Sequence, residues 1–362
     1  MHGTNKKQTK FNLLRAMNFE ANTGYCVIHT DIRTSPLYMF IMQRKPQAWQ
    51  ERMLKIIESE TPLPMNWKPS FPDFDSHLDE IGFIVTHINE KGFLKFHPLG
   101  GFDPKTLTAQ RVIIHGKKDV IGVMGSKPIH LMNAADRAKV ATVKDYFIDT
   151  GRPRKELEKI ISVGDTITRE RELIEMGDCL NCKSLDNRVS VFILIEMFRE
   201  MKKKPNYDVY GVFTVQEEIG IRGANVSSMD INPDFGFGLD TTIAWDTPGS
   251  TKQEQVSALG EGACIKVMDS STVCDYRMVE YMKELAKKKK IKTQLEILPA
   301  GGTDTAGIQR MNPGGSIAGA VSIPTRHIHQ TIEMVHKEDV MGAIHLLRHS
   351  VENLHSYNWK FE

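Results

Sequence analysis

The chain has 362 residues, of which 40% are hydrophobic and 25% are charged, as in an ordinary globular protein of one or two domains. Its 47 basic and 45 acidic residues give a formal net charge of +2. The chain therefore lacks the strong excess of basic residues that is typical of proteins that bind nucleic acids or anionic lipids. The apolar run over residues 37–42 is far too short for a bilayer span of about 20 residues, so we expect no membrane segment. Five cysteines without an N-terminal apolar run indicate a reducing, cytoplasmic location.

The first 76 residues have little regular pattern. A proline followed by apolar residues at helical spacing predicts one helix over about residues 46–59. Four prolines follow between residues 62 and 72, and proline is unfavourable inside a central strand. We therefore expect a strand to begin only near His77 and the sheet to lack strands on that side, which would leave His77 poorly supported.

Residues 90–175 have the character of a small β-rich insertion. A strand begins at Ile81, and short β-like runs then alternate with glycine and proline over residues 92–96, 111–115 and 120–124. Turn signals at this spacing are typical of a compact all-β unit. We predict an inserted β-rich domain at 90–175 within a catalytic domain formed by residues 77–89 and 176–362, after an atypical N-terminal segment at 1–76.

After residue 176 strands and helices alternate, which predicts an α/β sheet with helices on both faces. The predicted strands cover residues 207–213, 235–240, 263–267, 294–298 and 317–323. The predicted helices cover residues 184–198, 274–290 and 337–354. The first of these helices is apolar nearly all round and is expected to be buried.

Several acids and imidazoles follow apolar runs, where the carboxyl ends of strands place ligands in open α/β sheets. They are His77, Asp79, Asp186, Glu217, Glu218, Asp240 and His329. Two imidazoles with several carboxylates are typical of a two-metal hydrolytic site, and one carboxylate must stay off the metals as a general base. Glu217 and Glu218 are adjacent, so on extended backbone their side chains point in opposite directions.

A loop at Gly302-Thr303-Asp304 is a further candidate. Its residues could contact the substrate, or Asp304 could hold the loop in place. The sequence alone leaves both interpretations open. The pair Cys179 and Cys182 lacks the second pair of ligands that a structural zinc site usually needs, so we interpret it as ordinary thiols.

Taken together, the motifs resemble those of the M42 family of metallo-aminopeptidases, some members of which carry the label endoglucanase. The matching segments, in family order, cover residues 77–83, 125–130, 185–188, 215–224, 246–249, 301–304 and 326–329. The resemblance implies a mixed-sheet α/β catalytic domain with helices on both faces and an inserted small β-barrel-like domain.

The resemblance also implies a role for each candidate. The implied ligands of two divalent metals, zinc or cobalt with manganese as a third candidate, are His77 and Asp240 for one ion, Glu218 and His329 for the other, and Asp186 as the bridge. Glu217 would be the general base, and Asp79 would support the site from behind the ligands. Gly302, Thr303 and Asp304 would lie near the substrate.

The implied function is a two-metal aminopeptidase that removes N-terminal residues from peptides, with a metal-bridged hydroxide as the nucleophile. Family members usually form homo-oligomers, from dimers to dodecamers. Two alternatives stay open. One is a glycoside hydrolase of the endoglucanase type, which would need two carboxylates about 5–10 Å apart and would leave the histidines unexplained. The other is a catalytically impaired relative, because residues 1–76 do not match the family pattern.

Overall fold

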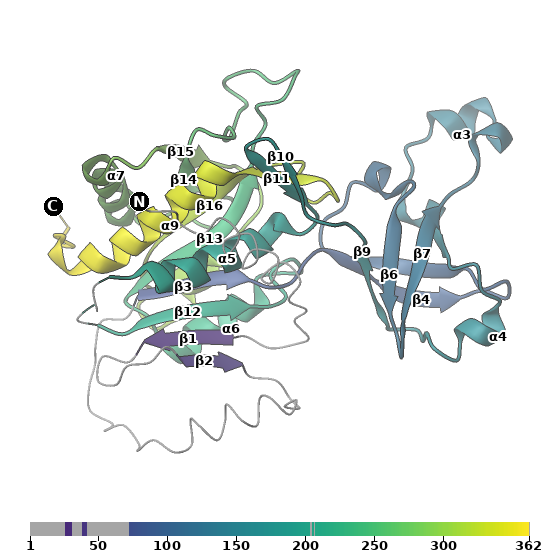
Figure 1. The fold of residues 1–362 in the computed structure, drawn as a ribbon, viewed down its shortest axis with the longest axis horizontal. Helices are drawn as coiled ribbons and strands as arrows, with labels where there is room; N and C mark the ends of the chain where they lie inside the picture. The colour runs from purple at the N-terminus through teal and green to yellow at the C-terminus, as the bar shows by residue number, and fades with distance from the viewer. Residues whose placement is uncertain (1–25, 31–37, 42–71, 203–204, 206, 362) are drawn as a thin grey trace, which may run out of the picture.

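The computed structural model describes residues 26–30, 38–41, 72–202, 205 and 207–361. In this part of the chain there are two bodies: an α/β domain built on a mixed sheet, and a closed β-barrel that projects from one end of it (Figure 1). The predicted fold class is therefore confirmed. The helix predicted over residues 46–59 lies outside the described residues. None of the described helices is long and apolar enough to cross a membrane.

Eleven of the described strands form the mixed sheet. Its order is β10 (Ile174–Met176), β11 (Cys179–Cys182), β17 (Glu333–His336), β16 (Ile317–Arg326), β13 (Phe235–Ile243), β3 (Pro72–His77), β12 (Val209–Thr214), β1 (Cys26–Thr30) and β2 (Tyr38–Ile41). Strand β14 (Ala263–Met268) branches from β16 and pairs with β15 (Thr293–Ile297). The four central strands β16, β13, β3 and β12 are parallel, and parallel strands of this kind are buried on both faces.

Strand β3 corrects the prediction for the N-terminal side of the sheet. It begins at Pro72, not near His77, and it pairs in parallel with β12 on one side and β13 on the other. Strands β1 and β2 extend the sheet beyond β12, so strands are present on the side where we expected none. Proline is tolerated as the first residue of a strand, where its missing N–H costs little, and Pro72 has this position.

Helices cover both faces of the sheet, as predicted (Figure 1). One face carries α5 (Leu185–Glu200), α7 (Tyr276–Lys289) and α9 (Lys337–Asn353), and the other carries α6 (Arg222–Ile231) and α8 (Thr305–Arg310). Helix α5 packs against β3 and β13 of the sheet and also against α9, which explains why its sequence is apolar on nearly every side. Gly238 of β13 allows α8 to lie close, because a Cβ atom there would stand 1.9 Å from the Thr305 hydroxyl.

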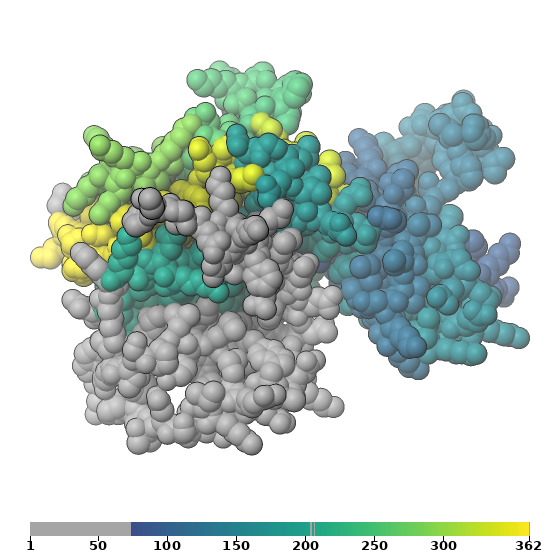
Figure 2. All heavy atoms as spheres, in the orientation of Figure 1, coloured from purple at the N-terminus to yellow at the C-terminus, as the bar shows by residue number. Residues whose placement is uncertain are grey.

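Within residues 82–169 six strands close into the barrel. Around it they run β4 (Gly82–Ile88), β5 (Leu94–Leu99), β8 (Phe147–Asp149), β7 (Asp119–Gly125), β6 (Arg111–His115) and β9 (Thr166–Arg169). Two short helices, α3 (Ala134–Ala138) and α4 (Arg154–Leu157), lie in its connections. In the space-filling view the barrel residues form a separate lobe beside the α/β domain (Figure 2).

The barrel has its own hydrophobic core, which includes Phe83, Ile114 and Ile148. Separate cores of this kind are typical of separate domains. Strand β4 pairs with β5 and β9, so it is part of the barrel, whereas the predicted division placed residues 77–89 in the catalytic domain. At the other end, β10 joins the main sheet although its first two residues fall inside the predicted insertion.

Candidate active site

Parallel strands bring the first candidates to one edge of the sheet. His77 is the last residue of β3 and pairs with Thr214, the last residue of β12. On the other side Asp75 of β3 pairs with Gly238 of β13. Asp240 lies two residues beyond Gly238, as His77 lies two residues beyond Asp75, so Asp240 and His77 are level. The carboxyl ends of these strands thus form the floor of the site, as expected for an open α/β sheet.

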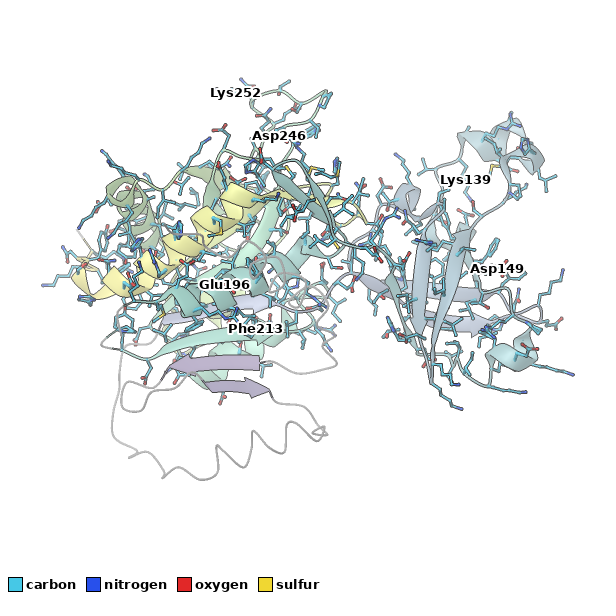
Figure 3. The ribbon with its side chains drawn as sticks, in the orientation of Figure 1. Lys139, Asp149, Glu196, Phe213, Asp246 and Lys252 are labelled. Carbon is cyan, nitrogen blue, oxygen red and sulfur yellow. The ribbon has the colours of Figure 1, made fainter. Side chains whose placement is uncertain are left out.

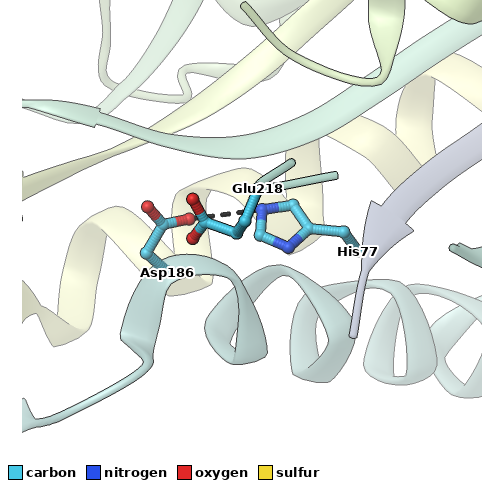
Figure 4. Close-up of side chains that lie close together, drawn as sticks. All are labelled: His77, Asp186 and Glu218. Atoms are coloured by element: carbon cyan, nitrogen blue, oxygen red, sulfur yellow. Dashed lines mark ion pairs between the residues drawn. The ribbon is translucent and has the colours of Figure 1, made fainter. Parts of the chain in front are cut away.

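Asp186 stands between the two candidate histidines. Its Oδ1 lies 3.4 Å from Nε2 of His77, and its Oδ2 lies 3.3 Å from Nε2 of His329. Each imidazole has a second carboxylate: Asp240 Oδ1 is 3.6 Å from His77 Nε2, and Glu218 Oε2 is 3.4 Å from His329 Nε2. His77, Asp186 and Glu218 each offer one ligand atom within 4.8 Å of the others (Figure 4). The arrangement is two imidazole–carboxylate pairs that share one further carboxylate.

Asp79 supports this arrangement through the backbone. Its carboxylate accepts hydrogen bonds from the backbone N–H groups of Glu217 and Glu218, at 3.2 and 3.3 Å. Its backbone oxygen lies 3.1 Å from Nδ1 of His77, so an Nδ1–H donates to it and leaves Nε2 free to face Asp186. One residue therefore orients the glutamate turn and the histidine ring together.

Without a bound cation, the buried carboxylates of the site would repel one another if they were all ionised. Burial and nearby carboxylates raise the pKa of Glu217 and of Glu218 well above the usual range. Within the described residues Glu218 Oε1 is buried without a hydrogen-bond partner. Burial acts to lower the pKa of His77, but Asp240 and Asp186 raise it well above the usual value. Imidazole nitrogen and carboxylate oxygen atoms are ligands that suit divalent cations such as zinc, cobalt or manganese. A bound cation would also offset the negative charge of the carboxylates.

A pocket of about 420 Å³ opens above these groups. Both candidate glutamates, both candidate histidines and the loop residues Gly302 and Thr303 line it. Asp304, the third residue of that loop, is not on the pocket wall. It is buried, and its carboxylate accepts a hydrogen bond from the hydroxyl of Thr214. This contact ties the loop to the end of β12, in keeping with a loop-holding position.

The segment that carries His329 is held at its start by an ion pair. Arg326, at the end of β16, donates to both carboxylate oxygens of Asp246, at 2.6 and 2.7 Å. Asp246 is labelled in Figure 3 on the α/β domain, below the loop that carries Lys252. Beyond Arg326, His327 and His329 have positive φ angles of 58° and 62°, a region that is unfavourable for residues other than glycine. Such conformations are concentrated at functional sites.

The fold and this geometry agree with what comparisons with known proteins show. The model of the M42 glutamyl aminopeptidase family matches residues 73–346. The chain belongs to this family. A lysyl aminopeptidase of Pyrococcus furiosus is 32% identical over 286 residues, which are 77% of this chain and 80% of that protein. The family assignment confirms the predicted resemblance and the predicted class of enzyme, an aminopeptidase.

Two solved structures extend the comparison. The TET aminopeptidase of a marine sediment Thaumarchaeota archaeon has a TM-score of 0.81 at 29% identity, and the match covers 97% of this chain and 98% of that one. The Pyrococcus horikoshii TET1 peptidase, which can assemble into a tetrahedron or a large octahedral shell, has a TM-score of 0.71 at 25% identity and covers 83% of this chain and 92% of that one. Both of these peptidases therefore share the fold of this chain over most of its length.

The structure also brings residues to the site of this M42 peptidase that the sequence analysis did not select. Lys266 lines the pocket and is buried beside Glu296 and Asp269, at 2.8 and 3.2 Å. Glu333 is buried and accepts a hydrogen bond from the backbone N–H of Asp186, at 3.0 Å. A lone lysine inside the apolar strand 263–268 was a usable signal for Lys266. Nothing in its local sequence distinguishes Glu333.

Proposed function

We propose that this protein is a two-cation aminopeptidase that removes single residues from the N-termini of peptides. The observation that carries the proposal is the position of Asp186, with one carboxylate oxygen toward each of two imidazoles, at 3.4 and 3.3 Å. A carboxylate that faces two nitrogen ligands in this way suits a bridge between two cations. His77 with Asp240 would hold one ion, and Glu218 with His329 would hold the other.

Bound divalent cations would supply Lewis-acid polarisation of the scissile carbonyl group and make water acidic enough to react. The protein's own side chains would transfer the proton and position the reacting groups. Glu217 is the pocket carboxylate that this scheme leaves unassigned to an ion, and its raised pKa suits a group that takes a proton from water and passes it to the leaving amine. Asp79 keeps Glu217 in place through the hydrogen bond at 3.2 Å.

The wall of the pocket at Gly302 and Thr303 would contact the first residue of the substrate. Thr303 donates a hydrogen bond to the hydroxyl of Thr305 at 2.9 Å, which helps to hold its side chain in place. Asp304 would act behind this wall and fix the loop. The substrate's free amine would find negative charge from several buried carboxylates at the closed end of the pocket.

The two alternatives receive less support. An endoglucanase-type glycosidase needs a pair of carboxylates and has no use for His77 and His329, each within 3.6 Å of two carboxylates. An impaired relative was proposed because of residues 1–76. Strand β3, however, carries His77 between two parallel neighbours, and the family model begins at residue 73.

We also propose that the protein acts as a homo-oligomer, from a dimer to a dodecamer. The support is similarity to the Pyrococcus horikoshii TET1 peptidase, which can assemble into closed shells. A cytoplasmic location is in keeping with the free thiols of the described cysteines.

The deciding experiment combines metal content with activity. Protein purified without chelator is analysed for zinc, cobalt and manganese, then stripped, reloaded with each metal and assayed on a panel of aminoacyl anilides. We expect two cations per chain, loss of hydrolysis on stripping, and recovery on reloading. Metal content near zero that added cations cannot raise, or hydrolysis of glycosides that survives a chelator, would overturn the proposal.

A further inference from the structure

The loop that carries His329 receives little support from the sheet. It lies between the end of β16 at Arg326 and the start of β17 at Glu333. Its backbone has positive φ at His327 and His329, and the side chain of His329 is 37% exposed, against 1% for His77. Other contacts must therefore hold this histidine in its position.

Those contacts come from the barrel. Arg169, the last residue of β9, donates a hydrogen bond from Nη1 to the backbone oxygen of His329, at 3.0 Å. The hydroxyl of Thr331 donates to the side-chain oxygen of Gln110, at 3.3 Å. Gly101 lies against the imidazole itself, since a Cβ atom there would be 3.3 Å from Nδ1 of His329. The barrel thus forms one wall of the site and contacts the histidine loop at three points.

Arg169 is an unusual residue to bury. It is 1% exposed, and in the described part of the chain its Nε and Nη2 atoms have no hydrogen-bond partner. Its guanidinium carbon lies 5.2 Å from the centre of the Phe102 ring. Burial lowers its pKa, and the nearby carboxylates of Glu333 and Glu218 oppose that effect. A buried guanidinium with one strong contact is costly, so a fold-only role would be served better by an apolar side chain.

Two buried polar side chains thus hold the backbones of two candidate ligands. Glu333 accepts from the N–H of Asp186, and Arg169 donates to the carbonyl group of His329. We propose that Arg169 is a positioning residue through which the barrel holds His329, and that it sets the affinity of the cation position that includes His329. The inference rests on the proposed function, because it requires that His329 is a cation ligand.

Arg169→Met is the main test, because methionine keeps the packing against Phe102 and removes the donor and the charge. Stripped protein is titrated with zinc in a calorimeter. We expect two binding steps in the unmodified protein, and in the variant a selective weakening of one step by about 10–100-fold, the usual effect of losing a group that orients a ligand. Arg169→Lys keeps a charged donor and should restore part of the lost affinity.

Arg154→Met is the matched control, because Arg154 is also a barrel arginine but its partner is the exposed Glu158, at 2.7 Å. It should leave both steps unchanged. Arg169→Gln serves if Arg169→Met does not fold, since glutamine is too short to reach the same carbonyl group. Folding is checked by thermal unfolding of the metal-free proteins.

The outcomes separate the two proposals. Binding of fewer than two zinc ions per chain in the unmodified protein counts against the proposed function. Two steps there, with both equally affected or both unchanged in a folded Arg169 variant, overturn the positioning role alone. If Arg169→Met and Arg169→Gln both fail to fold while Arg154→Met folds, Arg169 supports the fold as a whole, and the specific role is also overturned.

Discussion

Glu217 and Glu218 are neighbours in the chain, yet their carboxylates approach different histidines. Oε2 of Glu217 lies 3.8 Å from Nε2 of His77, and Oε2 of Glu218 lies 3.4 Å from Nε2 of His329. Asp79 fixes the backbone of both, so the separation is built into the turn. Two residues of the same type in adjacent positions should therefore be separable by substitution.

We expect Glu217→Gln to retain both cations and to lose turnover by about 10²–10⁴-fold, the usual contribution of a general base. Glu218→Gln should lose turnover and also bind one cation more weakly, because the substitution replaces a charged cation ligand with a neutral one. Steady-state kinetics on an aminoacyl anilide and metal analysis of the same samples check both expectations. Near-normal turnover in Glu217→Gln would show that another group is the base.

Some residues of the site could be predicted from the sequence, and others are revealed only by the structure. Acids and imidazoles at the ends of apolar runs were predictable, because strand ends converge in this type of sheet. The structure brings those candidates together, although their roles stay predictions. Arg169 and Glu333 were not predictable, because each acts on a residue 160 and 147 positions away, respectively, through a single hydrogen bond. Only the folded chain reveals such pairs.

At the scale of elements, the two histidines sit on supports of different strength. His77 ends a strand that is hydrogen-bonded on both sides, whereas His329 lies in a loop outside the sheet. The sequence pattern had instead predicted weak support for His77, because Pro72 was interpreted as a barrier to a central strand. That interpretation was wrong because Pro72 is the first residue of β3, a position in which a strand tolerates proline.

Hydrogen exchange should reveal this difference. In stripped protein we expect the amides of residues 327–332 to exchange much faster than those of residues 74–77, since local opening needs fewer contacts to break. Added zinc should slow exchange in the loop far more than in the strand. Exchange followed by mass spectrometry measures both segments in one sample. Equal protection of the two segments without metal would contradict the expected ranking.

At the scale of the whole molecule, the alternation of strands and helices was enough to predict an α/β sheet with a β-rich insertion. The order of strands across the sheet was not predictable from periodicity, because pairing partners such as β3 and β13 are far apart in the chain. Nor was the position of β4 in the barrel predictable, because that strand follows the site residues directly and its partner β9 lies at the far end of the barrel segment.

The many buried acids of the site also affect the stability of the whole chain. In the metal-free protein burial raises the pKa of Asp304 to about 7 and that of Glu333 to about 8. The pKa values of Glu217 and Glu218 are raised in the same way. A carboxyl group with a raised pKa in the folded state holds its proton longer there than in the unfolded chain. The free energy of unfolding must then fall as the pH rises through that interval.

The histidines act in the same direction. The pKa values of His77 and His329 are raised above the usual value, so the stability that they contribute is complete at low pH and is lost as the pH rises through the folded pKa. Groups with a lowered pKa, such as Asp79, act in the opposite direction, but only as the pH falls below the ordinary carboxyl range. The two effects therefore occupy different pH windows.

We therefore expect stripped protein to have a lower free energy of unfolding at about pH 8 than at about pH 5.5. Saturating zinc should reduce or reverse the difference, because cations replace the protons that the acids would otherwise bind. Urea unfolding at both pH values, with and without zinc, measures the effect. Glu333→Gln removes the group whose pKa is about 8 and should flatten the dependence of the stripped protein. A stripped protein that becomes more stable with rising pH would show that the pKa values of these acids are not raised in the folded chain.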